Sequence, residues 1–162
     1  MSATDVTAPD GTNTASTITA TRSNTSQTVV WYYSPDLSLT GQHTATVYLK
    51  ANTPGDIGKT ITFWMNNGST RNSTDIVLTG SWTRVTMTNT YVFAGNVDRP
   101  FNIGFLAGSS SDTSVAFDVW GAQLESGTSA TAYAATGPLS ATTISDYRHL
   151  RFVNGTDWLC TR

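Results

Sequence analysis

HTATVYLK, from His43 to Lys50, is the stretch that decides the fold. Its apolar side chains, Ala45, Val47 and Leu49, recur at every second position. A period of two is typical of a strand with one face buried, because successive side chains of a strand point to opposite faces. We therefore expect these three residues to lie in a core. The residues predicted to lie on the other face are Thr44, Thr46, Tyr48 and Lys50.

The next strand is predicted to repeat this arrangement after a turn-rich stretch, ANTPGDIG. Ile61, Phe63 and Met65 occupy alternate positions and are expected to point inward. The Pro, Gly and Asp of the connecting stretch favour a turn. The residues predicted to point outward are Thr60, Thr62, Trp64 and Asn66.

Further short segments rich in β-branched and aromatic residues are separated by clusters of Gly, Asn, Ser and Pro. This spacing leaves no room for crossover helices, so it predicts an all-β antiparallel sandwich or barrel. The expected strands are Thr14–Arg22, Thr28–Ser34, Asp75–Thr79, Trp82–Thr88, Phe101–Leu106 and Ser114–Leu124.

The last of these strands contains a glycine. Val115, Phe117 and Val119 share one face, which places Trp120 on the opposite face. We expect Gly121 to let the chain bend, because an isolated glycine in a strand often marks a bulge or a tight bend.

The composition excludes several classes of protein. The 162 residues suit one domain with a short extension. Charged residues make up only 12% and the net charge is −2, with the basic residues scattered, so a nucleic-acid partner is not expected. Cys160 is the only cysteine, which rules out an intrachain disulfide. No apolar stretch is long enough for membrane insertion, and no secretion signal is expected at the start.

A β-hairpin is predicted at the C-terminus. Asn154-Gly155, a strong hairpin signal, lies between Tyr147–Val153 and Thr156–Thr161. An isolated hairpin is marginally stable in water, so it should dock on another surface. We expect residues 138–162 to form a linker and this hairpin, with a role in assembly. The candidate assembly residues are Arg148, Arg151, Phe152 and Trp158.

The segment from Asp118 to Tyr133, DVWGAQLESGTSATAY, resembles the closing segment of a known family. The family comprises carbohydrate-binding-module-like jelly-roll domains of bacteriophage tail-fibre and other virion proteins. APDGTNTAS, from Ala8, resembles its opening strand, and HTATVYLKA, from His43, resembles an inner strand. SWTRV, from Ser81, follows in the same order. The resemblance spans roughly residues 8 to 135 and implies a two-sheet jelly roll over residues 1–137.

The resemblance also implies a role and a setting. We expect a virion structural protein, a tail, baseplate or capsid-surface component that is assembled in the host cytoplasm. Its partners would be other virion proteins, and it would form a homo-oligomer, with a trimer favoured. The terminal hairpin or the N-terminal arm, Ser2 to Pro9, would anchor it. A competing hypothesis is a free-standing lectin-like module that binds a host or cell-wall glycan.

The outward-facing aromatic side chains allow two interpretations. In the first, the apolar face of a sugar stacks on Trp31, Tyr48 or Trp64. In the second, these rings pack under loops or against a neighbouring subunit. The polar residues that would contact sugar hydroxyls are Asn66, Arg84 and Gln42.

In the resembled family a structural calcium lies near the first and last strands. Asp10 and Asp118 are the acidic residues that those strands would bring close together. Calcium takes about six to eight oxygen ligands, and two carboxylates with backbone carbonyls would supply only part of that set. The alternative is an ordinary turn at Asp10-Gly11 and a solvated Asp118.

Catalysis is not expected from this sequence. It has two histidines, His43 and His149, one glutamate, and no local signature of a nucleophile or a metalloprotease. The acidic residues are spread through turns, where aspartate favours tight geometry. We therefore expect a binding or assembly module and no cofactor besides a possible structural calcium.

Overall fold

The fold was determined from a computed structural model, which describes residues 6–33, 39–67, 71–91 and 101–134 and the backbone of two C-terminal strands. These ranges form strands and one short 3-10 turn, η1 (Pro54–Asp56). The strands are β1 (Ser16–Thr21), β2 (Val29–Tyr33), β3 (Gly41–Ala51), β4 (Thr60–Asn66), β5 (Arg71–Val77), β6 (Thr83–Tyr91), β7 (Phe101–Phe105), β8 (Ser114–Ser126), β9 (Tyr147–Val153) and β10 (Asp157–Thr161).

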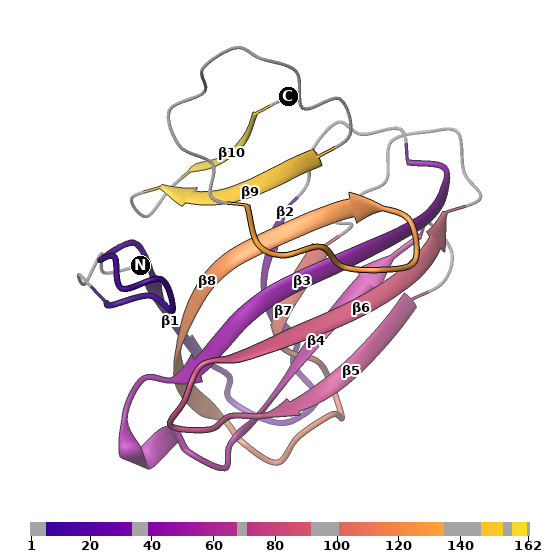
Figure 1. The fold of residues 1–162 in the computed structure, drawn as a ribbon. Helices are drawn as coiled ribbons and strands as arrows, with labels where there is room; N and C mark the ends of the chain where they lie inside the picture. The colour runs from indigo at the N-terminus through magenta and orange to yellow at the C-terminus, as the bar shows by residue number, and fades with distance from the viewer. Residues whose placement is uncertain are drawn as a thin grey trace.

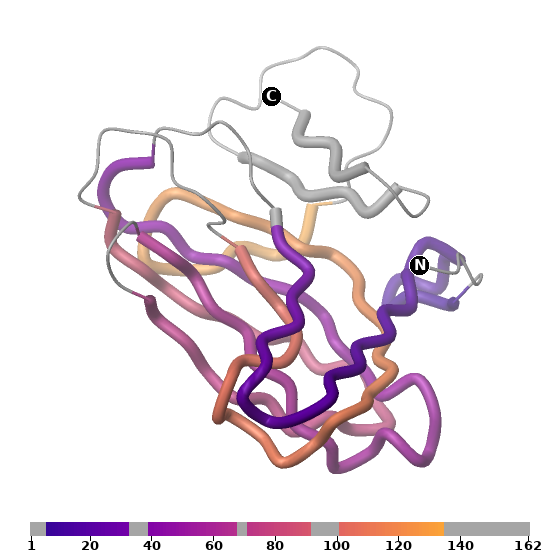
Figure 2. Tube along the Cα trace, turned by 180° about the vertical axis from the view of Figure 1, so that it is seen from behind, coloured from indigo at the N-terminus to yellow at the C-terminus, as the bar shows by residue number. Residues whose placement is uncertain are grey.

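The first eight strands form two antiparallel sheets that pack face to face (Figure 1). In the first sheet the order is β1-β8-β3-β6, and in the second sheet it is β2-β7-β4-β5. The chain crosses between the sheets after β1, β2, β3, β5, β6 and β7, and Figure 2 shows from behind how β1 leads into β2. This strand order is that of a jelly roll, so the expected fold class is confirmed.

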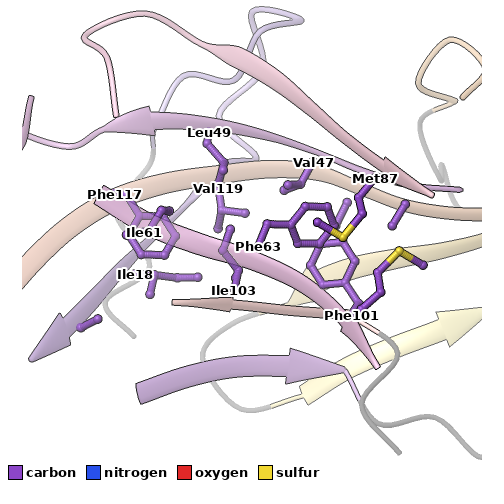
Figure 3. Packing of buried hydrophobic residues seen from close by; sticks show 14 of the residues in the cluster. Ile18, Val47, Leu49, Ile61, Phe63, Met87, Phe101, Ile103, Phe117 and Val119 are labelled. Atoms are coloured by element: carbon purple, nitrogen blue, oxygen red, sulfur yellow. The ribbon is translucent and has the colours of Figure 1, made fainter. Parts of the chain in front are cut away.

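The core lies between the two sheets (Figure 3). Ala45, Val47 and Leu49 of β3 are buried there, as their alternation predicts, and so are Ile61 and Phe63 of β4. Met65 and the three apolar residues of β8 on the same face are also buried. Each large apolar side chain that is fully removed from water contributes about 1.5–3 kcal/mol, so this layer provides most of the stability.

Strand β8 contains a bulge at Gly121. Thr46 of β3 pairs with Gln123, whereas Tyr48 pairs with Trp120, so Gly121 and Ala122 together face one residue of β3. Gly121 has φ +62, a conformation that glycine adopts without strain. The expected bend is therefore present. It also changes the alternation, because Ala122 and Leu124 face the core after the bulge.

Two strand boundaries differ from the predictions by more than two residues. Strand β5 begins at Arg71 and not at Asp75, and β6 ends at Tyr91 and not at Thr88. All but one side chain of β5 is exposed, so its residues show no apolar alternation that would have marked the start of the strand.

The backbone of β9 and β10 forms the predicted hairpin, which extends the first sheet (Figure 1, yellow). Strand β9 pairs with β8 at Gln123, Leu124 and Glu125. Strand β1 pairs with the same edge of β8 nearer its start, from Ser114 to Val119. No helix in the described part of the chain has the length and apolarity needed to cross a membrane.

Candidate functional site

A row of large side chains crosses the outer face of the first sheet. Tyr48 of β3 lies opposite Arg84 of β6 on one side and opposite Trp120 of β8 on the other. The ring centroids of Tyr48 and Trp120 are 5.3 Å apart, and the Arg84 guanidinium lies 5.6 Å from the Tyr48 ring centroid. Because directly opposite residues of an antiparallel pair share a face, strand register alone brings these three together.

The N-terminal loop, residues 6–15, packs on this row. Ala8 and Ala15 are buried against Trp120 in a small apolar cluster that lies outside the core. The indole Nε1 of Trp120 donates to Thr14 Oγ1 at 2.9 Å, and that of Trp82 donates to the carbonyl oxygen of residue 7 at 3.2 Å. Both indoles thus hold the loop in place.

The return segment, residues 127–134, follows β8 and folds back over the same face. Tyr133 lies against Trp120, with 4.2 Å between the ring centroids. The Thr131 hydroxyl donates to Glu125 Oε1 at 2.6 Å, its amide donates to Oε2 at 3.2 Å, and Gln123 Nε2 donates to the hydroxyl at 3.2 Å. The Glu125 side chain is consequently shielded from water.

The N-terminal loop and the return segment reduce the exposure of this face. Thr44 and Thr46, predicted to lie on the face away from the core, are fully buried there. The Thr44 hydroxyl donates to the carbonyl oxygen of Gly127 at 2.8 Å. The prediction of their face is therefore correct, and the return segment covers this part of the face.

Two buried polar atoms on this face have no hydrogen-bond partner: Arg84 Nε and Gln123 Oε1. They lie on either side of Thr46, since Arg84 Nη2 donates to Thr46 Oγ1 at 3.1 Å and Gln123 is the cross-strand partner of Thr46. Nε is a donor and Oε1 is an acceptor, so the two are complementary to a group such as a hydroxyl. Buried polar atoms without partners are costly, and they often mark a functional position.

The structure separates the predicted glycan-binding residues. Tyr48 and Arg84 are neighbours on the first sheet, whereas Trp64 and Asn66 belong to the second sheet. Trp64 lies on the outer face, as predicted, but it is only 4% exposed, so it offers no open ring to a sugar. Trp31 pairs with Ile103 of the core and itself packs against the core, so its assignment to an outer face is wrong.

The two predicted metal ligands occupy unlike surroundings. Asp10 lies in an exposed turn, where hydrogen bonds from the hydroxyl and the amide of Thr12 lower the pKa of its carboxyl. Asp118 is buried and ion-paired with Lys50, so the alternative of a solvated Asp118 is wrong. The described residues contain no group of three or more His, Cys, Asp or Glu side chains that could hold a metal.

The remaining candidates are the two histidines and the predicted assembly residues. His43 is buried, and its ring packs edge-on against Tyr91 at 5.4 Å. The side chains of the four assembly candidates and of His149 lie outside the described residues. The assembly candidates are Arg148, Arg151, Phe152 and Trp158.

Three further residues on the outer face of the first sheet were not among the predicted site residues. They are Trp120, Gln123 and Tyr133. For Trp120 a signal exists, because it occupies the face opposite Val119 directly before a glycine. Tyr133 carries no such signal, since a non-strand segment that folds back over a sheet has no periodicity.

Comparison of the chain with protein-family models, with curated proteins and with solved structures finds no match.

Proposed function

We propose that this protein is a non-catalytic structural component of a virion, in which the jelly roll is attached on the side of its first sheet and displays its second sheet. One observation carries this orientation: the N-terminal loop and the return segment both pack on the outer face of the first sheet. The hairpin pairs with β8 of the same sheet. The segments through which the chain enters and leaves the sandwich thus gather on one side.

Such an arrangement suits a displayed module, because attachment through one side leaves the opposite side, with its exposed edge strand β5, directed away from the attachment. The described aromatic residues of the first sheet then serve to hold the connecting segments, which is the packing interpretation of outward-facing rings. The virion setting itself rests on the resemblance of the closing segment, and a fold alone does not define a function. The partners proposed are other virion proteins and further copies of this chain.

A truncation tests the proposal. A variant that ends at residue 137 should keep the thermal unfolding transition and the β-rich circular dichroism spectrum of the sandwich, because β9 pairs with only three residues of β8. It should lose the oligomeric state of the full chain, with a trimer expected, in sedimentation velocity. A matched variant that lacks Ser2–Asp5 separates the N-terminal arm from the hairpin as the anchor. A monomeric full-length chain that also fails to attach to particles would contradict the proposal.

The neighbouring side chains of Tyr48 and Arg84 on the outer face of the first sheet favour a second candidate, a lectin-like glycan-binding module. Both residues are only partly buried, so the guanidinium can donate to a sugar hydroxyl while the Tyr48 ring offers an apolar face. Binding on a glycan array that is lost in Tyr48→Ala and Arg84→Lys, and kept in Tyr32→Ala on the other sheet, would support it. An array without any bound glycan would end this candidate.

A further inference from the structure

The seam between β1 and β8 is where the resemblance implies a structural calcium, because these are the first and last strands of the jelly roll. A calcium site needs oxygen atoms that are free to face a cation. Thr17 of β1 and Asp118 of β8 are directly paired at this seam, and Arg22 directly follows β1. The oxygen atoms at both places are already bound by cationic side chains of the chain itself.

Asp118 is the first case. The residue is 1% exposed, and Lys50 Nζ lies 3.2 Å from Oδ2. The other oxygen, Oδ1, accepts from Thr17 Oγ1 at 2.8 Å and from Asn52 Nδ2 at 2.9 Å. Each of these three groups is a donor: the ammonium neutralises the carboxylate, and the hydroxyl and the amide hydrogen-bond to it. A divalent cation there would meet an ammonium group and an amide N–H in place of ligand oxygens.

Arg22 is the second case, at the end of the same seam. Its side chain is 4% exposed, and it has no carboxylate partner within the described residues. The guanidinium instead donates to five backbone carbonyl oxygens and lies 4.3 Å from the centroid of the Phe105 ring. The carbonyls belong to residues Thr25, Gln27, Leu106, Ser110 and Asp112.

This convergence of carbonyls resembles the oxygen shell of a bound cation, with a guanidinium at its centre. The five acceptors come from the β1–β2 connection and the β7–β8 connection, so one side chain ties both loops together. A guanidinium has five N–H donors and stays protonated at every ordinary pH, which makes it a permanent internal cation. Asp10, the second expected ligand, is exposed, and its Oδ1 accepts from the amide and the hydroxyl of Thr12.

The residues at the seam thus do not fit a calcium ion. We infer that the Arg22 guanidinium and the Lys50 ammonium perform at the β1–β8 seam the structural role that the resemblance assigns to calcium, so that the fold is stable without a divalent cation. This inference concerns the folding of the sandwich and holds for either proposed function.

Thermal unfolding of the full chain tests it. The midpoint, Tm, should be the same after dialysis against EDTA and after addition of millimolar CaCl2. Lys50→Met leaves a buried carboxylate without its cation and should lower Tm by on the order of 5–10 °C in both buffers. The double variant Lys50→Met/Asp118→Asn should recover part of that loss, because it removes both charges. Arg22→Met should cost more than Lys50→Met, since five carbonyl oxygens each lose a hydrogen bond.

Arg71→Met is the matched control, because Arg71 lies exposed on the edge strand β5 and its replacement should change Tm by no more than about 2 °C. If Arg22→Met does not fold, Arg22→Lys replaces it, and the smaller ammonium should still lower Tm because it reaches fewer carbonyls. A wild-type Tm that falls with EDTA or rises with CaCl2 would overturn the inference, as would a Lys50→Met chain with unchanged Tm.

Discussion

Tyr48 on β3 and Trp120 on β8 are cross-strand partners whose ring centroids lie 5.3 Å apart, on the side of the sheet that faces away from the core. This pair is the base of a second apolar cluster, on which the N-terminal loop and the return segment pack. The sandwich therefore buries apolar side chains on both faces of its first sheet.

Gly121 should not tolerate a side chain. An alanine Cβ there would lie 3.2 Å from ring carbons of both Tyr48 and Tyr133, and the backbone has φ +62. We expect Gly121→Ala to lower the free energy of unfolding by about 2 kcal/mol or more. Gly55→Ala is the control, because its nearest neighbour would lie at 3.7 Å and its φ is not positive. Equal urea midpoints for the two variants would contradict this account of the bulge.

Trp64 should act as a structural residue and not as a sugar platform. Its ring is almost completely buried on the second sheet, so we expect Trp64→Ala to cost about 3–5 kcal/mol of unfolding free energy. Tyr32→Ala, which truncates a ring 38% exposed on the same sheet, should cost clearly less. Chemical denaturation of both variants measures the difference, and a Trp64→Ala protein of wild-type stability would show that the ring is not packed.

Thr131 should control how firmly the return segment is held. Thr131→Val keeps the shape of the side chain and removes the hydroxyl that donates to Glu125 and accepts from Gln123. The loss leaves buried polar atoms unsatisfied, and we expect a cost of about 1–3 kcal/mol. Hydrogen exchange should rise first in residues 127–134. Thr128→Val, at an exposed position of the same segment, should leave exchange unchanged.

Asp56 should make stability depend on pH in acid. Burial alone would raise the pKa of its carboxyl, but hydrogen bonds from Lys59, Thr53 and the amide of Ala116 outweigh burial and lower it below 3.8. A group with a lowered folded-state pKa stabilises the fold above its unfolded-state pKa, and this contribution is lost as pH falls through the folded-state value. The difference in Tm between wild type and Asp56→Asn should thus be full at neutral pH and shrink below about pH 3.8. A difference that stays constant across this range would be inconsistent with the hydrogen bonds described.

Strict alternation made the core of β3 and β4 predictable, because one buried face imposes a period of two. The run from Val29 to Tyr33 has no such alternation, since all five residues favour strands. Its inward face follows only from the pairing of Trp31 with Ile103, so the prediction that Trp31 lies on an outer face is wrong.

For the outer-face residues, the sequence predicted which face each side chain occupies but not whether that side chain is buried. Alternation assigned Trp64 and Thr46 to the correct face. The sequence of a strand does not show, however, which other segment covers that face. Asp118 shows the same limit for charge, because its partner Lys50 lies on another strand and the pair exists only through the β3–β8 register.

Because β1 and β8 are neighbours, Val6 and Tyr133 contact one and the same apolar cluster although they lie near opposite ends of the described jelly roll. The first and last segments of the sandwich therefore lie close together. Such a domain can be inserted into a surface loop of an unrelated carrier protein without separating the two ends of that loop.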